Sequence, residues 1–445
     1  MGIKISMIGA GSIGFSSSVA KEMAASKTLH GTEFMLMDID EERLNTSLKN
    51  VREIIKTANA KINVTATSDR REALKNCNYL ITSCEKERIK YWKQDILIPQ
   101  RHGVFQLVGE NGGPGGTIHA LRNITLFMDI AADMKEYCPD AWMMNFTNPM
   151  SFVCTYMQKY SGIRTVGLCH QIHGSFGVVA EMLGMEPGDL QVVAAGINHL
   201  AWLMDIRKRG TKTSFMKEFT ELVRKSEHWH KNQEAIPSQI FTLDILKAFG
   251  VYPVGYDDHI SEYFHCFYDR QGWESLDYES KLSHLDKFEK NSPSGKLSDK
   301  ERMELSTVKY PFPKNPEDPY YQEKACTIIE ALETNTPTYL DSSVIVNHGA
   351  IENLPADAVV DIPSMVLGGE VRPIHIGKLP TAAAEICRRQ ITIHELTVEA
   401  AATGDREKLL QAFALDPYTH SLKQAGNILE DFLDFYKVEL PQFQN

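Results

Sequence analysis

A cysteine and several histidines in the middle of the chain are residue types that could bind a metal ion. Cys169 is followed by His170 and His173, and His199 comes about thirty positions later. A closed structural zinc site would have four ligands at short regular spacing, and this pattern differs from it. An open site with two protein ligands and room for substrate oxygens suits Mn²⁺, Co²⁺, Ni²⁺ or Fe²⁺. The spacing alone is equally compatible with a buried thiol and a hydrogen-bonded imidazole in a core.

Carboxylates in two further segments could act as acids or bases. Asp257 and Asp258 are adjacent and precede a histidine, so this segment offers the groups that general acid–base catalysis uses. Glu110 and Asn111 precede the run Gly112–Gly116, in which four glycines surround a proline and indicate a close backbone approach to a ligand. An exposed acidic turn and a flexible loop are the respective alternatives.

The N-terminal segment has the G-x-G-x-x-G spacing of a dinucleotide-binding turn, between an apolar run and a helical pattern. Gly9 is expected to make the tight turn, Gly11 to let the backbone approach a pyrophosphate, and Gly14 to let helix and strand pack closely. The N-terminus of the helix would then face the phosphates. Asp38 ends the next strand and would bind ribose hydroxyls, which predicts NAD rather than NADP. A purely structural glycine turn is the alternative.

Further cofactor contacts are expected near this turn and at a later strand end. We expect Ser12, Ile13 and Arg43 to lie against the dinucleotide. Asn148 follows the carboxyl end of a later strand, where doubly wound sheets bind ligands, and could contact cofactor or substrate. Because asparagine before proline is also common in turns, a turn is the alternative.

The first half of the chain alternates strand and helix patterns, which predicts how these residues are positioned. Short apolar runs predict strands at residues 3–9, 33–38, 64–67, 79–83, 141–145 and 164–169. Helical patterns lie between them at residues 16–25, 41–58 and 118–137. The alternation predicts an α/β fold, with a Rossmann-like doubly wound parallel sheet that forms an NAD-binding domain in residues 1–190.

The second half has a mixed pattern. Helices are predicted at residues 174–189, 215–226, 238–249, 324–334 and 381–402, and a strand at 191–203. Residues 290–321 are polar and predict a long surface excursion. We expect residues 191–445 to form a C-terminal α+β domain that provides substrate, metal and oligomer contacts.

The overall composition restricts the class of protein. The net charge is −11, and an acidic surface repels polyanions, so neither nucleic acid nor an anionic membrane is expected as a partner. No apolar run reaches the roughly 18 residues of a membrane span, and the N-terminus is expected to be a core strand rather than a signal peptide. The eight cysteines are scattered without a C-x-x-C pair, which favours reduced thiols in a cytoplasmic protein.

Read in order, these segments resemble family 4 of the glycoside hydrolases, which depend on NAD and a divalent metal. The resemblance runs from the glycine turn through Asn148-Pro149, Cys169-His170, Asn198-His199 and the Asp257 segment to residues 347–355, and so covers nearly the whole chain. It implies that Cys169 and His199 hold the metal, with Mn²⁺ first among the candidates. It also implies a homodimer or homotetramer.

The resemblance implies hydrolysis of a glycoside through NAD-dependent oxidation at C3, deprotonation at C2, elimination and addition of water. Asp257 matches the position where family members have a Tyr or Asp base, and Asp258 beside it would contact the substrate. His170 stands where enzymes for phosphorylated sugars have Asp or Asn, which implies an unphosphorylated α-glucoside or α-galactoside.

The same resemblance suggests the remaining substrate contacts. His170 would bind a sugar hydroxyl or protonate the leaving oxygen, and Glu110 is a second candidate for that acid. Asn111 and Asn148 would also contact the substrate.

Two alternatives stay open. Gln171 departs from the Glu or Ser of α-glucosidase and α-galactosidase members, so an α-glucuronidase or α-galacturonidase of the same family is the first. A sugar carboxylate would then need a cationic partner such as Arg88, Lys86 or Arg372. A plain NAD-dependent 2-hydroxy-acid dehydrogenase, which would share the first domain and need no metal, is the second.

Overall fold

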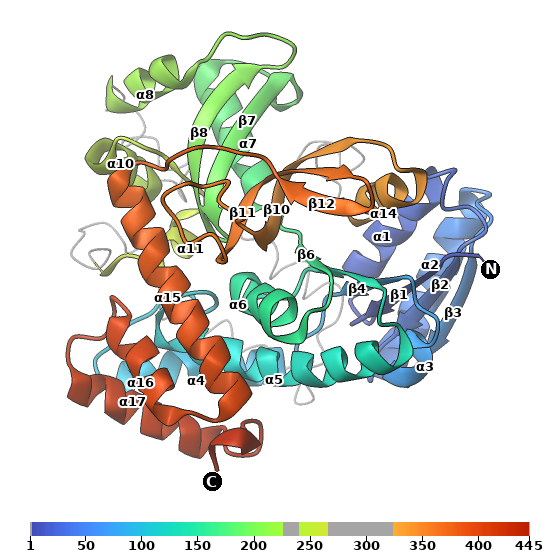
Figure 1. Cartoon of the computed structure of the whole chain (residues 1–445), viewed down its shortest axis with the longest axis horizontal. Coiled ribbons are helices and arrows are strands. Elements are labelled where there is room, and N and C mark those ends of the chain that lie inside the picture. The colour runs from blue at the N-terminus through green and yellow to red at the C-terminus, as the bar shows by residue number, and fades with distance from the viewer. Residues whose placement is uncertain (1, 226–239, 266–323, 445) are drawn as a thin grey trace.

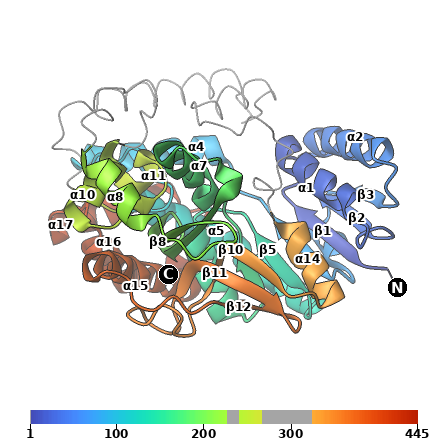
Figure 2. The ribbon, with the colours of Figure 1, turned by 90° about the horizontal axis from the view of Figure 1, so that it is seen from above.

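The computed structural model of the chain describes residues 2–225, 240–265 and 324–444. Within these residues twelve strands form one mixed sheet, in the order β3-β2-β1-β4-β5-β6-β10-β11-β7-β8-β9 with β12 on β11. Figure 2 shows β1 to β3 with their helices at one end of the molecule, and α8 and α10 at the other. In the described part of the chain, no helix combines the length and apolar character needed to cross a bilayer.

The first six strands are parallel, as the alternating pattern predicted. They are β1 Lys4–Ile8, β2 Glu33–Met37, β3 Asn63–Thr67, β4 Tyr79–Thr82, β5 Trp142–Asn145 and β6 Thr165–Gly167. The connecting helices include α1 Ile13–Ala25, α2 Glu41–Thr57, α3 Arg70–Leu74 and α5 Gly113–Tyr137. This arrangement confirms the predicted Rossmann-like parallel sheet.

The two faces of the parallel sheet are buried against different helices. In β2, Phe34 and Leu36 join the core that contains α1 and α2, whereas Met35 and Met37 join the core that contains Phe127 and other α5 residues. Successive side chains of a strand point to opposite faces, so burial on both faces requires an unbroken apolar strand. The continuous run of β2 meets this requirement.

The second half of the chain extends the same sheet with antiparallel strands. The predicted strand at 191–203 is wrong as a single element, because two strands, β7 Leu190–Ile197 and β8 Leu200–Lys208, form a hairpin there. The other strands are β9 Pro253–Val254, β10 Thr338–Val346, β11 Val359–Leu367 and β12 Glu370–Pro373. Since β10 pairs with β6, the sheet is continuous across residue 190, and the division into two domains there stays a prediction.

Several predicted helices are present with shifted ends. They are α7 Gln171–Leu183, α8 Met216–Lys225, α10 Ile240–Phe249, α14 Ala325–Thr334 and α15 Thr381–Thr403. Helix α5 begins at Gly113 and not at 118, so the glycine–proline run forms its first turn. The predicted excursion at 290–321 lies outside the described residues.

Other helices have no counterpart among the predicted elements. They are α4 Arg88–Arg101, α6 Met150–Thr155 with the π-turn Tyr156–Ser161, α11 Asp257–Ser261, α16 Arg406–Leu415, α17 Leu422–Phe435 and the short turn Pro441–Phe443, whereas the 3₁₀ turn Pro187–Asp189 lies at the end of the helix predicted at 174–189. Helices α4, α5, α15, α16 and α17 share a second core, which lies beside the parallel sheet (Figure 1). The segment 102–112 joins α4 to α5, and its Val104 belongs to this second core.

Candidate active site

The hairpin between β7 and β8 brings a histidine against the predicted metal-binding cysteine. His199 lies in the two-residue turn and has a φ of 65°, a left-handed conformation that is uncommon outside glycine. Cys169 follows β6, just before α7 begins. The two side chains meet with 3.4 Å between Cys169 Sγ and His199 Nε2.

This distance and the state of the imidazole fit a shared cation. For zinc, bond lengths of about 2.3 Å to sulfur and 2.0–2.1 Å to nitrogen place two ligands of one ion roughly 3.1–3.6 Å apart, a range that includes the observed distance. Burial, followed by the charge of His259, holds the pKa of His199 well below its usual range. A neutral imidazole keeps a lone pair for a metal. The pair therefore has the chemistry of a soft-to-borderline metal site.

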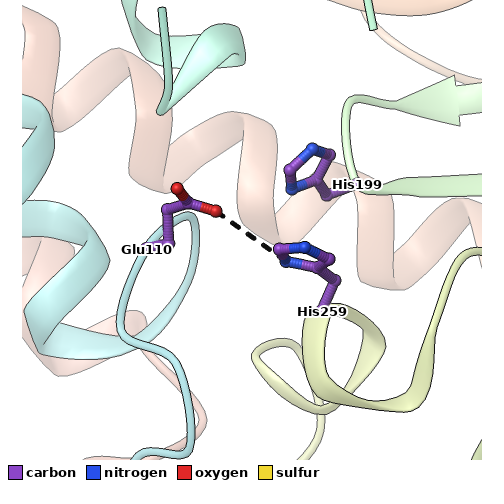
Figure 3. Close-up of side chains that lie close together, drawn as sticks. All are labelled: Glu110, His199 and His259. Carbon is purple, nitrogen blue, oxygen red and sulfur yellow. Dashed lines mark ion pairs between the residues drawn. The ribbon is translucent and has the colours of Figure 1, made fainter. Parts of the chain in front are cut away.

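A second histidine, His259, and the carboxylate of Glu110 also lie close to His199 (Figure 3). Ligand atoms of Glu110, His199 and His259 all lie within 4.8 Å of one another, so this group could also hold a metal ion. The two imidazole rings are 4.4 Å apart, and Glu110 Oε2 is 3.9 Å from His259 Nδ1. His259 was not among the predicted site residues, although its position two residues after Asp257 was a usable signal.

Glu110 is held as a carboxylate, which argues against the expectation that it acts as a general acid. Its Oε1 lies 2.7 Å from Nη2 of Arg88, and Arg88 also pairs with Glu85 at 2.9 Å. Burial alone would raise the pKa of Glu110, but the charges of Arg88 and His259 outweigh it and hold the pKa well below its ordinary value. An acid catalyst must carry a proton at working pH, which a lowered pKa disfavours, so the role of Glu110 as an acid stays a prediction.

The side chain of Asn111 contacts the His199 ring. Its Nδ2 lies 2.8 Å from His199 Nδ1 and 3.2 Å from Glu110 Oε2. The opposite ring nitrogen, Nε2, is the one that faces Cys169. A ligating Nε2 requires the ring proton on Nδ1, so with a metal bound the Asn111 amide would present its oxygen to Nδ1 and orient the ring in that way.

The predicted base, Asp257, is buried and binds the first backbone amides of helix α10. Asp257 is 1% exposed and accepts hydrogen bonds from the amides of Phe241 and Thr242 at 2.8 and 2.7 Å, and from the Thr242 hydroxyl. Burial raises its pKa to about 6, although these hydrogen bonds oppose the shift. Asp258 is half-buried and accepts a hydrogen bond from the amide of His259. The roles of both carboxylates stay predictions.

The two residues after Cys169 differ in their surroundings. His170 is exposed at the start of α7, and its charge contributes to the lowered pKa of His199. Gln171 is buried, and its Nε2 donates to the carbonyl of Val254 at 3.1 Å. Gln171 therefore holds the backbone of β9 beside the start of α7.

The glycine turn has the geometry of a nucleotide-binding turn at two of its three glycines. Gly9 has a φ of 89°, and a Cβ there would overlap the Ser83 carbonyl oxygen. The amide of Gly11 donates to Asp38 Oδ2 at 2.8 Å, and a Cβ at Gly11 would lie 2.6 Å from that oxygen. The packing role expected for Gly14 is wrong, because a Cβ there would meet no atom within 4 Å.

The other predicted cofactor contacts surround this turn and the end of β5. Arg43 donates from Nε to the carbonyl of Gly11 at 3.3 Å, and Ser12 and Ile13 are half-buried at the start of α1. Asn148 has a buried Oδ1 without a hydrogen-bond partner among the described residues. A buried acceptor without a partner is costly, which makes it a candidate for ligand contact.

Both halves of the chain match one family of enzymes. The family described as family 4 glycosyl hydrolase matches residues 4–185, and the one described as family 4 glycosyl hydrolase C-terminal domain matches residues 194–419. The chain belongs to family 4 of the glycosyl hydrolases. This confirms the resemblance predicted from the motifs.

Individual relatives align over nearly the full length. An alpha-galactosidase of Bacillus subtilis is 32% identical over 99% of this chain and 100% of its own, and an alpha-galactosidase of Rhizobium meliloti is 30% identical over 99% and 89%. The fold is similar to that of a 6-phospho-alpha-glucosidase from gut microorganisms, solved in complex with NAD and Mn²⁺, with a TM-score of 0.78, 18% identity and 99% of each chain covered.

Proposed function

We propose that the protein is an NAD- and Mn²⁺-dependent glycosidase that hydrolyses unphosphorylated α-glycosides, with an α-galactoside ahead of an α-glucoside. The observation that carries the proposal is the 3.4 Å approach of Cys169 and His199 beside the carboxyl edge of a Rossmann-like sheet. The order of the two sugars follows the two α-galactosidase relatives. Family membership also favours hydrolysis over the dehydrogenase alternative.

Two parts of the carboxyl edge would hold the two cofactors. The glycine turn follows β1 and Cys169 follows β6, three strand spacings or about 14 Å along the sheet. The turn, with Asp38 and Arg43, would bind the dinucleotide, and Ile39 next to them is 81% exposed and offers an apolar surface. When bound, NAD supplies a hydride acceptor and the cation supplies a Lewis acid for the sugar oxygens.

The chain's own carboxylates and imidazoles would move the protons. Asp257 would accept the C2 proton. A pKa of about 6 makes it a stronger base than an ordinary carboxylate, and at this pKa Asp257 is still ionised at neutral pH. His170, exposed beside the metal-binding cysteine, would bind a sugar hydroxyl or donate a proton to the leaving oxygen. Asp258, Asn111 and Asn148 would contact the sugar hydroxyls or the cofactor.

The charges near the cluster favour a neutral sugar over a uronide or a sugar phosphate. Arg88 reaches the cluster through Glu110, but its charge is already matched by Glu110 and Glu85. A sugar carboxylate or phosphate would have to displace one of these partners to pair with the guanidinium. A neutral glycoside needs no such exchange.

The cysteines and the net charge support a proposal about where the protein acts and with which partners. No disulfide links the cysteines of the described residues, which is consistent with a reducing, cytoplasmic location. The acidic composition argues against nucleic acid and membranes as partners. We expect a homodimer or homotetramer, to be checked by light scattering.

A panel of p-nitrophenyl glycosides tests the proposal. The purified chain is assayed with NAD⁺, Mn²⁺ and a thiol reductant on α- and β-galactosides, α-glucosides, α-galacturonides, α-glucuronides and a 6-phosphorylated α-glucoside. We expect fastest hydrolysis of a neutral α-glycoside without net NADH formation. Fastest hydrolysis of a uronide would support the first alternative. Steady NADH formation from a 2-hydroxy acid, with no hydrolysis, would refute the proposal.

A further inference from the structure

We infer that Glu262 is a positioning residue that assembles the metal-binding pocket without itself binding the metal. Glu262 follows α11 and is 2% exposed. Its hydrogen bonds run to the backbone of the segment 110–112, and its second oxygen faces His259, so two of the segments that form the cluster depend on it. The inference rests on the proposed function, because it assumes that Cys169 and His199 hold a cation.

One oxygen of Glu262 organises the segment that joins α4 to α5. Glu262 Oε1 accepts hydrogen bonds from three successive backbone amides, those of Glu110 at 2.6 Å, Asn111 at 2.9 Å and Gly112 at 3.3 Å. Successive amides that converge on one oxygen form an anion-binding concavity. Here the anion is a side chain of the protein, so the segment 110–112 takes its shape around Glu262.

The close approach of the two segments requires a glycine. A Cβ at Gly112 would lie 2.6 Å from the Glu262 carbonyl oxygen and 2.9 Å from Glu262 Cβ. Any larger residue would push the segment away from Glu262 and lengthen the three hydrogen bonds. The close packing of Glu262 against the segment 110–112 therefore requires a glycine at position 112, the first glycine of the glycine–proline run.

The second oxygen of Glu262 faces the cluster. Glu262 Oε2 is 3.7 Å from His259 Nδ1, too far for a direct hydrogen bond, and both buried atoms lack a hydrogen-bond partner among the described residues. His259 and Glu262 are three residues apart, so they lie on the same side of the helical turn. The carboxylate charge thus contributes to holding the His259 ring beside His199.

The path from Glu262 to the metal ligands passes through Asn111. The Asn111 amide is anchored on Glu262, and its side chain contacts Nδ1 of His199 at 2.8 Å. The other ring nitrogen of His199 faces Cys169 Sγ. Without Glu262 the segment 110–112 would be free to move, and the His199 ring could then turn. Loss of Glu262 should therefore weaken metal binding indirectly, through Asn111 and His199. Groups that orient a ligand in this way typically contribute about 10–100-fold to metal affinity.

The test compares variants of Glu262 with a matched carboxylate elsewhere. Mn²⁺ affinity is measured by electron paramagnetic resonance of the free ion, NAD affinity by fluorescence titration, and stability by thermal unfolding, all on the full chain. The control is Asp133→Ala, which removes a buried carboxylate paired with Arg70, about 30 Å along α5 from Gly113.

We expect Glu262→Ala to weaken Mn²⁺ binding at least about 10-fold and to leave NAD affinity within about twofold. Glu262→Gln should give a smaller loss, because an amide oxygen can still accept the three hydrogen bonds but carries no charge. Asp133→Ala should lower the unfolding temperature without changing Mn²⁺ affinity. If Glu262 had a purely structural role, Glu262→Ala would behave like this control, with a lower unfolding temperature and unchanged Mn²⁺ affinity.

Wild-type Mn²⁺ affinity in Glu262→Ala would overturn the inference. If that variant does not fold, wild-type affinity in Glu262→Gln together with an unchanged kcat/KM would overturn it. Failure of the wild-type chain itself to bind Mn²⁺ is a different result, since it would contradict the proposed function and the inference with it.

Discussion

The dinucleotide turn and the metal cluster are assembled in different ways, although both draw on the carboxyl edge of one sheet. The turn is made by residues that follow two neighbouring strands, β1 and β2, and its contacts are mostly those of backbone amides and glycines. The cluster is made by four segments: the connection from α4 to α5, the end of β6, the β7–β8 hairpin and α11. A change in the turn should therefore act locally, whereas a change in the cluster should spread through several segments.

The largest effect is expected from removing the thiolate of the cluster. Cys169→Ser keeps the size of the side chain but replaces a soft ligand with a weak one. We expect Mn²⁺ affinity to fall about 100-fold or more, hydrolysis to fall about 1,000-fold, and NAD affinity to stay unchanged. Calorimetric titration with each cofactor checks this. Equal loss of NAD and Mn²⁺ binding would mean that the two regions are not separate.

The two outer glycines of the turn provide a matched pair for the local region. Gly9→Ala introduces a side chain at a φ of 89°, against the Ser83 carbonyl, and should cost about 1–3 kcal/mol and reduce NAD affinity roughly 10–100-fold. Gly14→Ala meets no atom within 4 Å and should change NAD affinity less than about threefold. Both affinities are measured by fluorescence titration. A larger effect at Gly14 than at Gly9 would contradict this account of the turn.

A buried histidine outside both regions predicts a pH dependence of stability. His394 on α15 is buried 4.2 Å from the Phe152 ring, and burial lowers its pKa to about 3. The unfolded chain binds its proton near pH 6.5, so this residue destabilises the fold as pH falls from about 6.5 toward 3, by about 2 kcal/mol at pH 5. His394→Leu should flatten the difference in unfolding free energy between pH 7 and pH 5. An unchanged difference in urea unfolding would show that His394 is not neutral.

The smallest effect concerns the choice between NAD and NADP. Asp38→Asn removes the charge that would repel a 2′-phosphate but keeps an oxygen for the amide of Gly11. We expect NAD affinity to fall about 10-fold and the preference over NADP to shrink by a similar factor. Unaltered preference in a dinucleotide titration would place the ribose away from Asp38.

The parallel half of the fold could be predicted because its signals are local. Apolar runs such as Glu33–Met37 and the glycine spacing after β1 lie within a few residues of the structures that they form. The break between β7 and β8 was missed, although the polar pair Asn198-His199 separates two apolar runs there, because these residues were interpreted as ligands within one strand and not as a two-residue turn. The glycine–proline run predicted a close backbone approach to a ligand, but the amides of Glu110 and Asn111 just before it bind a carboxylate of the chain about 150 positions away.

The candidate site shows the same limit. Cys169 and His199 could be named from a family resemblance, but their separation of 3.4 Å depends on strand pairing that no local pattern encodes. The roles of Glu110 and Glu262 depend on which cation or amide faces each carboxylate, Arg88 in one case and backbone amides in the other. Such pairings are long-range and are decided by the packed fold.

The central claim is that Cys169 and His199 bind the same cation. Titration of the full chain with Co²⁺, followed by absorption spectroscopy, tests this claim most directly. We predict a thiolate-to-cobalt charge-transfer band that saturates at one equivalent and disappears in Cys169→Ser. Saturating Co²⁺ without such a band, or an unchanged band in that variant, would contradict the account.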